Sequence, residues 1–208
     1  PIKVQYIENH ELIYIDTIFI KDSKEVNNQT YQSLLKPLLN ISSERDLLQR
    51  VKWLESSHKF LQNSIHFAYG KTNSGGFALL LDIIPKFENN VSGLIGANRV
   101  NNGDWITNGE IELNLENIWS TASNSLFHWK RLNEKSEIIS FLHYEPTLWN
   151  SPFGLQIKLD KELRDKEYIS QYRDLRIFSN LLRYGKWFFG SKNLTIIPSD
   201  IGYASGLI

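Results

Sequence analysis

The sequence predicts two parts of different fold class. The first is a small α+β unit over residues 12–86, and the second is a set of antiparallel β-strands over residues 87–208 that form an incomplete transmembrane barrel. Apolar residues recur at helical spacing only in the first part. From residue 87 onward they alternate with polar residues, which is typical of strands with one wet and one apolar face. We expect residues 1–11 to be a linker or the end of a preceding unit.

The first part is predicted to run strand, helix, helix, strand, strand. Leu12–Ile20 is rich in β-branched residues that alternate with polar ones, which indicates a strand. Two apolar sets at helical spacing follow: Tyr31, Leu34, Leu35 and Leu38, limited by Pro37, and then Leu47, Leu48, Val51 and Leu54. Ser43 and Asp46 are placed as the N-cap and capping position of the second helix. Ile65–Tyr69 and Phe77–Ile84 complete the unit as two strands joined by a turn.

The second part is predicted to contain roughly eight strands, at about 9–11 residues for each membrane crossing. Its clearest segment alternates Glu110, Glu112 and Glu116 with Ile111, Leu113 and Leu115. Residues 153–160 repeat this alternation, and the last strand is expected over residues 202–208. We expect Ile111, Leu113 and Leu115 to face lipid and the acidic row to face a water-filled lumen, since unpaired carboxylates are costly inside a protein core.

A soluble β-sandwich would also alternate, so a soluble β-rich binding module stays an alternative. Two observations favour the membrane. Residues 106–117 stay in phase for about twice the usual five or six residues of a soluble strand. Five tryptophans fall within or near strand ends, where an aromatic girdle would sit: Trp105, Trp119, Trp129, Trp149 and Trp187.

The composition excludes several classes of function. With 23 basic and 23 acidic residues, the chain has no basic excess for nucleic-acid binding. It has no Cys, which excludes disulfides, thiolate nucleophiles and Cys-type zinc sites. The longest apolar stretch, Phe77–Ile84, is far shorter than the roughly 20 residues of a membrane-spanning helix. Because the chain starts at Pro1 and contains no Met, we expect it to be a piece of a longer protein.

Several short motifs are set aside. Gly70-Lys-Thr lacks the glycine of a phosphate loop, since Ile65 stands five residues earlier, and a strand rather than a helix follows it. His128 and His143 are interpreted as polar or lumen-facing histidines, because no carboxylate or third His is placed with them in the sequence. The acidic row on residues 110–116 is favoured as a solvated face over a cation site. No Gly-x-Ser-x-Gly elbow of a serine hydrolase occurs, and we expect no catalytic residue, cofactor or metal.

Two segments of the second part carry a resemblance to a known family. The first ends the long strand and contains Asn117, Ile118, Trp119 and Thr121, and the second contains Tyr144 and Pro146 and continues into Ser-Pro-Phe-Gly at residues 151–154. They resemble the opening strands of the BamA/TamA-like outer-membrane assembly superfamily, the bacterial surface antigen family. In that family a strand ending in Asn-Leu-Phe-Gly-Thr-Gly precedes a hairpin with Tyr-x-x-Pro and a Pro-Phe-Gly-like turn. Residues 12–86 are similar to its polypeptide-transport-associated (POTRA) domain.

The chain departs from the family pattern at three places. Ser120 and Ala122 stand where the motif has glycines, the residues that permit positive φ. Only Phe60 represents the Gly-Tyr-Phe that usually precedes the second POTRA strand. The Arg-Gly-Phe loop of the later barrel half would follow Ile208.

The resemblance implies insertion of outer-membrane β-barrel proteins or translocation of polypeptides, without enzymatic chemistry. It also implies a location in the cell outer membrane, with residues 1–86 in the periplasm. The implied partners are outer-membrane lipid, unfolded β-barrel clients or secreted polypeptides, and accessory lipoproteins, but not nucleic acid. A two-partner secretion transporter and the barrel of a patatin-like lipase fusion share this architecture and stay alternatives.

The predicted seam of the barrel is the segment from Val91 to Asn98. A spanning strand with a poorly paired edge can offer that edge to an incoming strand. The candidate seam residues are Val91, Gly93, Ile95 and Ala97. The small residues serve equally well to accommodate barrel curvature, so both interpretations stay open. In the POTRA-like unit, the edges at residues 12–20 or 65–69 are expected to receive substrate segments in the same way.

Overall fold

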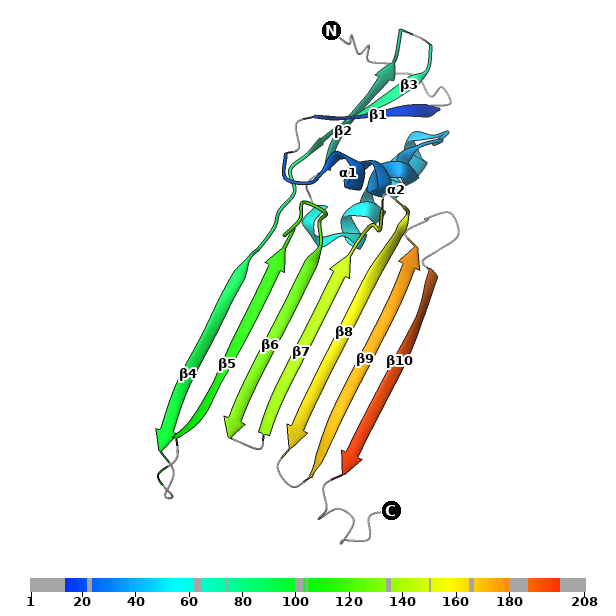
Figure 1. Ribbon diagram of the computed structural model, residues 1–208. Helices are drawn as coiled ribbons and strands as arrows, with labels where there is room; N and C mark the ends of the chain where they lie inside the picture. Colours follow the sequence, from blue (N-terminus) through cyan, green and yellow to red (C-terminus); the bar gives the residue numbers. More distant parts are fainter. Residues whose placement is uncertain are drawn as a thin grey trace.

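The computed structural model of the chain describes residues 14–21, 24–61, 65–73, 75–99, 103, 105–133, 136–149, 151–164, 167–179 and 187–198. It contains a three-stranded sheet with two helices, followed by a seven-stranded sheet. In Figure 1 the helices stand between the three-stranded sheet and one end of the seven-stranded sheet, so the N-terminal unit covers that end. Residues 1–11 and the expected strand at 202–208 lie outside the part that the structure describes.

The N-terminal unit, residues 14–83, has the predicted order of elements. These are β1 (Ile15–Lys21), α1 (Asn28–Leu35), the 3₁₀ turn η1 (Lys36–Leu38), α2 (Glu44–Ser57), η2 (Lys59–Leu61), β2 (Ile65–Lys71) and β3 (Phe77–Ile83). The strand order is β1-β3-β2, with β1 parallel and β2 antiparallel to β3. Both strands named in the sequence as edges, β1 and β2, are therefore the edges of this sheet.

The helices begin and end for local reasons. The Asn27 side chain caps α1 by accepting from the Thr30 N–H at 2.7 Å, and Pro37 stands where α1 gives way to η1. Ser43 caps α2 by accepting from the Asp46 N–H at 3.2 Å, as predicted. The prediction that Leu48 lies on the apolar face of this helix was wrong, because its side chain is 42% exposed. It lies one position beyond the stripe that Leu47 begins, and 100° of helix rotation turns it to the surface.

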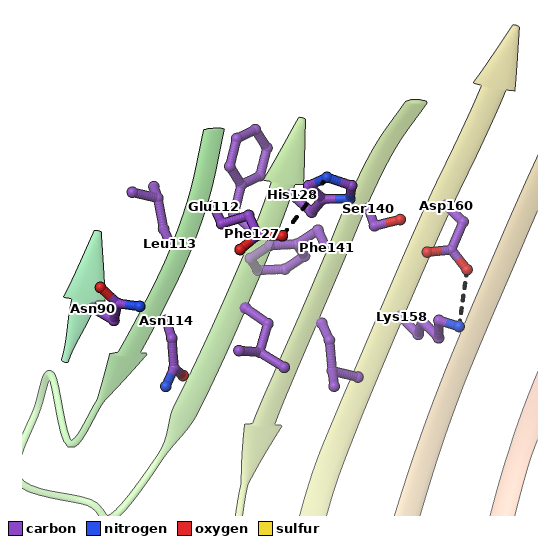
Figure 2. Close-up of a pocket in the computed structure, with 12 residues that line it drawn as sticks. Asn90, Glu112, Leu113, Asn114, Phe127, His128, Ser140, Phe141, Lys158 and Asp160 are labelled. Carbon is purple, nitrogen blue, oxygen red and sulfur yellow. Dashed lines mark ion pairs between the residues drawn. The ribbon is translucent and has the colours of Figure 1, made fainter. Parts of the chain in front are cut away.

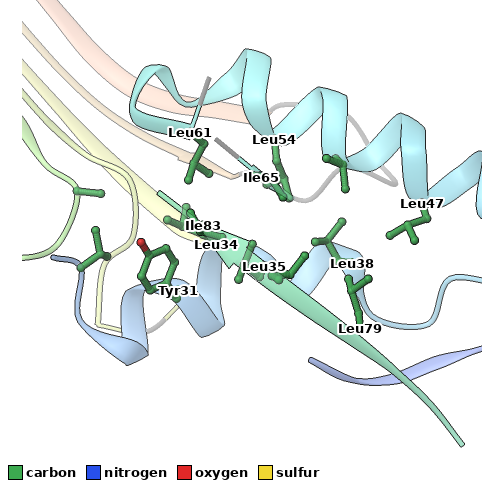
Figure 3. Close-up of a cluster of buried hydrophobic side chains, with 14 of the residues drawn as sticks. Tyr31, Leu34, Leu35, Leu38, Leu47, Leu54, Leu61, Ile65, Leu79 and Ile83 are labelled. Carbon is green, nitrogen blue, oxygen red and sulfur yellow. The ribbon is translucent and has the colours of Figure 1, made fainter. Parts of the chain in front are cut away.

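The buried core lies in the N-terminal unit (Figure 3). Side chains of both helices meet those of β1, β2 and β3 there, and the fully buried ones include Tyr31, Leu35, Leu38, Leu47, Leu54, Leu61, Leu79 and Leu81. One member comes from the other part of the chain: Ala122, which is 5% exposed and belongs to the turn after the second strand of the large sheet. The two parts therefore share one core at this point.

The large sheet is antiparallel and open, with its strands in sequence order (Figure 1). They are β4 (Asn90–Arg99), β5 (Trp105–Glu116), β6 (Asn124–Asn133), β7 (Ser136–Glu145), β8 (Phe153–Arg164), β9 (Tyr168–Ser179) and β10 (Trp187–Pro198). Seven of the roughly eight predicted strands are thus observed. Four of them, β5, β8, β9 and β10, are 12 residues long, and the other three are 10 residues long. These lengths are about twice that of the usual soluble strand.

The register gives the large sheet two chemically different faces. Ile111 of β5 pairs with Trp129 of β6, which pairs with Ile139 of β7, and directly paired residues share a face. We call this the apolar face; it carries Ile111, Leu113, Leu115, Phe127, Trp129, Ile139, Phe141, Ile157 and Leu159. The opposite, polar face carries Glu110, Glu112, His128, Lys130, Lys158, Asp160, Asp174, Arg176 and Lys192.

The apolar face is not a protein core. Ile111, Leu113 and Leu115 are only half-buried, and none of them belongs to the buried cluster. A sandwich would bury such a row completely against a second sheet. The structure thus places the three residues together on one face, as predicted, and their contact with lipid stays a prediction. Among the helices that the structure describes, none has the length and apolar character needed to traverse a bilayer.

Candidate functional site

The edge strand β4 carries the predicted seam residues. Among the strands described, β4 pairs only with β5, in a register from Asn90↔Asn114 to Arg99↔Trp105, and stands last in the sheet. Its side chains are open to the surroundings: Val91 is 69%, Leu94 78% and Ile95 63% exposed. The outer row of backbone N–H and C=O groups of β4 therefore faces no strand in this part of the chain, and such a row can pair with an added strand.

The glycines of this region bring β4 and β5 close together. A side chain at Gly109 of β5 would collide with the carbonyl oxygen of Leu94, and a Cβ at Gly93 would lie 3.0 Å from the carbonyl oxygen of Glu110. Gly109 therefore needs glycine for this close backbone approach, whereas a Cβ at Gly93 would require the neighbouring strand to shift by a few tenths of an ångström. Both interpretations of Gly93, as part of the seam and as an accommodation of barrel curvature, stay predictions.

The turn between β5 and β6, residues 117–123, adopts a backbone for which glycine is the usual residue. Asn117, Ser120 and Ala122 have φ values of 60°, 56° and 59°. The Asn117 N–H donates to the Ser123 carbonyl at 2.7 Å, and the Asn117 Oδ1 accepts from the Ala122 N–H at 2.9 Å. Ser120 and Ala122 thus hold positive φ without being glycine, which costs about 1–2 kcal/mol for each residue.

The same turn is tied to the N-terminal unit. The Asn117 Nδ2 donates to the Glu25 carbonyl at 2.7 Å, and the Asn27 N–H donates to the Ser120 carbonyl at 2.7 Å. Val26 lies between these two bonds and is buried in the shared core with Ala122. Asn117 therefore closes its own turn with one side-chain atom and holds the N-terminal unit with the other.

The linker between the two parts makes a second attachment. The Phe60 and Phe87 rings stack at 5.3 Å, and the Lys86 N–H donates to the Phe60 carbonyl at 3.0 Å. Lys59 Nζ lies 3.1 Å from Glu88 Oε2 and 3.7 Å from Glu116 Oε1. The hydrogen bond to Glu88 and the charge of Glu116 raise the pKa of Lys59 above its ordinary value. Lys59 thus joins η2 to both the linker and the end of β5.

The two family-motif segments meet at this end of the sheet. The Thr121 hydroxyl donates to Glu145 Oε2 at 3.0 Å, and the Trp119 ring packs edge-on against His143 with centroids 6.0 Å apart. Tyr144 stacks on Phe178 at 5.0 Å, on the polar face, and Pro146 is buried. The structure therefore brings Asn117, Trp119, Thr121, Tyr144 and Pro146 to one end of β5–β7, next to the N-terminal unit (Figure 1).

Ionic side chains cross the polar face from strand to strand. His128 Nε2 lies 2.8 Å from Glu110 Oε1, and Lys130 Nζ lies 3.0 Å from Glu110 Oε2. Further along, Lys158 pairs with Asp160 at 3.0 Å; Figure 2 shows this pair beside His128 and Glu112 around a hollow of about 460 Å³. A second hollow of about 450 Å³ lies between η2 and the polar face. This face is suited to water and polar solutes.

Sequence reasoning missed part of this arrangement. The statement that no carboxylate is placed with His128 was wrong, because Glu110 and Glu112 lie beside it. The register was available in principle: β5 and β6 fold back symmetrically about residue 120, which sets residue 112 opposite residue 128. His143 lies on the opposite face, bonded to Ser125 Oγ at 2.8 Å, so the two histidines do not meet.

Four of the five tryptophans expected at strand ends lie at or near the end of a strand, and Trp129 does not. Trp105 and Trp187 begin β5 and β10, and Trp119 and Trp149 lie in turns at the end near the N-terminal unit. Trp129 lies mid-strand on the apolar face, where its Nε1 donates to Glu137 Oε1 at 3.0 Å.

Comparisons with known proteins identify similar folds but no sequence family. No protein-family model matches the sequence, and no curated protein matches it. Among solved structures, BamA from Haemophilus ducreyi lacking POTRA domains 1–3 is similar with a TM-score of 0.53 and 10% identity, covering 86% of this chain and 34% of that one. CdiB from Acinetobacter baumannii is similar with a TM-score of 0.49 and 12% identity, covering 91% of this chain and 40% of that one.

The likeness to the BamA structure shows the fold alone. The likeness covers 86% of this chain, and the antiparallel strands of its large sheet are consistent with the strands of a barrel. The chain spans between a third and two-fifths of the length of the two structures it matches.

Proposed function

We propose that the chain is part of an outer-membrane β-barrel protein that assembles other outer-membrane proteins, and that it acts through binding rather than through a chemical step. In this proposal residues 12–86 are a POTRA domain in the periplasm, and residues 87–208 are the first strands of the barrel. The sequence motifs at Asn117, Trp119, Thr121, Tyr144 and Pro146 support membership in the BamA-like superfamily. The barrel-type fold shared with BamA supports it independently.

The membrane location is supported by the two-faced sheet. Nine large apolar side chains project from one face of β5–β8, and none of them is buried. Each therefore keeps apolar surface whose removal from water would be favourable. The opposite face carries ion pairs that need water or one another. Lipid outside and water inside satisfy both faces at once, as in a transmembrane barrel.

The observation that carries the assembly role is the exposed edge of β4. Among the strands that the structure describes, none pairs with the outer edge of the ten-residue strand β4, and an edge of this kind can accept a client strand by β-augmentation. Its sparse packing at Gly93, Gly96 and Ala97 makes this end of the sheet easy to deform. We propose that Val91, Gly93, Ile95 and Ala97 form the seam at which client strands enter the barrel wall, and that the edges of β1 and β2 hold client segments before entry.

A scan with single cysteines tests the membrane assignment cleanly, because the chain contains no Cys. Leu113 and Phe141 on the apolar face, and Glu112 and Ser140 on the polar face, are each replaced by Cys in the full chain and labelled with an environment-sensitive dye. In lipid vesicles, lipids with a quencher on the acyl chain should quench the labels at residues 113 and 141. Labels at the matched neighbours 112 and 140 should respond instead to a water-soluble quencher. Equal quenching of neighbouring positions would refute the two-faced membrane sheet.

Cross-linking at the edge tests the assembly role. Ile95→Cys on β4 should form a disulfide with a cysteine in the terminal strand of an unfolded β-barrel client during its insertion, whereas Ile139→Cys in the interior strand β7 should not. If a secreted polypeptide forms cross-links at polar-face positions and none at Ile95, the proposed function would be translocation of polypeptides instead of assembly of outer-membrane proteins. If residues 95 and 139 cross-link equally, the edge has no special role.

A further inference from the structure

Three potential metal ligands converge on the polar face of β5 and β6. Glu110 and Glu112 lie two residues apart on β5, so both project to the same face, and His128 of β6 is paired directly with Glu112. One ligand atom from each of the three lies within 4.8 Å of the other two. The His128 Nε2 is 2.8 Å from Glu110 Oε1 and 4.0 Å from Glu112 Oε1.

The sheet holds these ligands in place. Two positions on one strand and the directly opposite position on its neighbour form a triangle whose size is fixed by the spacing of strands, about 4.8 Å, and of alternate residues. Ion ligands at 2.0–2.2 Å from a common centre need only small side-chain rotations from such a triangle. No backbone movement is required, because β5 and β6 keep an unbroken register from residue 109 to residue 116.

Charge at this point of the face is unbalanced. Elsewhere Asp160 is paired with Lys158 at 3.0 Å, and Asp174 is held by Arg176. Glu110 shares its charge with Lys130 through Oε2, while its Oε1 points to His128. Glu112 has no Lys or Arg within 4.0 Å among the residues that the structure describes, and 62% of its side chain is exposed. One carboxylate is therefore left for a cation that enters from the lumen side.

The geometry points to a binding site for a divalent transition-metal ion of the Zn²⁺ type, with Glu110, Glu112 and His128 as its protein ligands. The imidazole nitrogen selects transition metals over Mg²⁺ and Ca²⁺, which prefer six or more oxygen ligands. Three protein ligands leave a position for water, and the hollow of about 460 Å³ beside Glu112 and His128 has room for it (Figure 2). This inference does not rest on the assembly role, since it needs only a polar face open to water.

The ammonium group of Lys130 competes with the ion for this site. Metal binding loosens the contact of Lys130 with Glu110, because the ion and the ammonium group bind the same carboxylate. We therefore expect the affinity for the ion to rise when Lys130 is removed.

Cobalt titration of the full chain, purified in detergent and freed of metal with a chelator, tests the site. Co²⁺ should give a visible absorption band that saturates at one ion per chain, and Zn²⁺ should abolish that band by displacement. Glu112→Gln and His128→Gln should each weaken binding by about tenfold or more, since each removes one of three ligands. Lys130→Met should tighten binding several-fold, an effect that adsorption to scattered surface carboxylates would not show.

Matched variants separate a built site from adventitious binding. Glu116→Gln, on the same strand and face, and His143→Ala, on the opposite face, should leave both affinity and stoichiometry unchanged. Far-ultraviolet circular dichroism identifies any variant that has lost its strands, and Glu112→Gln is close to isosteric. An affinity that is equal in the parent chain and in the Glu112→Gln/His128→Gln double variant would overturn the proposal, as would the absence of any Co²⁺ band.

Discussion

Replacing Asn117 by Ala should destabilise the junction between the two parts of the chain by about 2–5 kcal/mol. The change removes two hydrogen bonds, from Asn117 Nδ2 to the Glu25 carbonyl at 2.7 Å and from the Ala122 N–H to Asn117 Oδ1 at 2.9 Å. Each bond contributes about 0.5–1.5 kcal/mol net. It also places Ala at a φ of 60°, which costs about 1–2 kcal/mol for a residue without the tolerance of Asn for this region.

Two further variants separate these contributions. Asn117→Gly removes both bonds but accepts the positive φ, so it should cost about 1–3 kcal/mol. Asn117→Asp keeps an acceptor for the Ala122 N–H and the tolerance of positive φ, and it loses only the bond to Glu25. Its expected cost is about 1 kcal/mol.

Denaturant titration followed by tryptophan fluorescence measures the three free energies of unfolding, with the full chain in the same detergent throughout. Limited proteolysis reports separately whether the N-terminal unit has come away from the sheet. The loss in free energy of unfolding is expected to be largest for Asn117→Ala, smaller for Asn117→Gly and smallest for Asn117→Asp. If Asn117→Ala costs less than about 0.5 kcal/mol, the level of an ordinary surface substitution, the side chain does not join the two parts and the reasoning fails.

Three further changes at the junction have expected outcomes that the same titration can check. Ser120→Gly should stabilise the chain by about 0.5–1 kcal/mol because it relieves a φ of 56°, whereas Ala122→Gly should be near neutral, since its lost buried methyl offsets the relief. Thr121→Val should cost about 1–3 kcal/mol, because it removes the donor to Glu145 Oε2 from a buried carboxylate whose Oε1 already has no partner in the described part of the chain; Thr121→Ser should restore most of the loss. Lys59→Met should lower the free energy of unfolding at neutral pH. Because the pKa of Lys59 is raised in the folded chain, this loss of stability should be present in full below the ordinary pKa of 10.5 and should disappear as the pH rises through the raised pKa.

Local patterns were sufficient to predict most of the fold. The N-cap of α2 at Ser43 and the end of α1 near Pro37 depend on contacts within a few residues, so they can be predicted from the neighbouring sequence. Alternation was clearest in β5 and β8, because each of these strands has a row of polar residues on one face and a row of apolar residues on the other. The error at Leu48 arose where two apolar residues stand side by side and only one can face the core.

The junction could not be predicted in this way, because its bonds join residues that are distant in sequence and that use backbone atoms. Asn117 donates to the Glu25 carbonyl across 92 positions of sequence. Every residue has a backbone carbonyl, so the type of residue at position 25 does not identify this acceptor. Asn117 was singled out only through the family resemblance, and Lys59 and Glu88 not at all. Charged residues that are distant in the sequence carry no sign that they will pair, and only the fold brings Lys59 within 4 Å of Glu88 and Glu116.

The position of the junction bears directly on the edge strand. β4 starts at Asn90, immediately after Glu88 and Asn89, and these two residues bind the end of β5: the Glu88 N–H donates to Glu116 Oε2 and the Glu116 N–H donates to Asn89 Oδ1, both at 2.7 Å. Lys59 of the N-terminal unit joins the same carboxylate. The start of the edge strand is therefore fixed to β5 and to the N-terminal unit by one acidic side chain, Glu116, which is 8% exposed. A rotation of the N-terminal unit cannot leave β4 unaffected, so we expect Glu116→Gln, which weakens the contact with Lys59 but keeps the acceptor for Glu88, to alter cross-linking at Ile95 without unfolding the sheet.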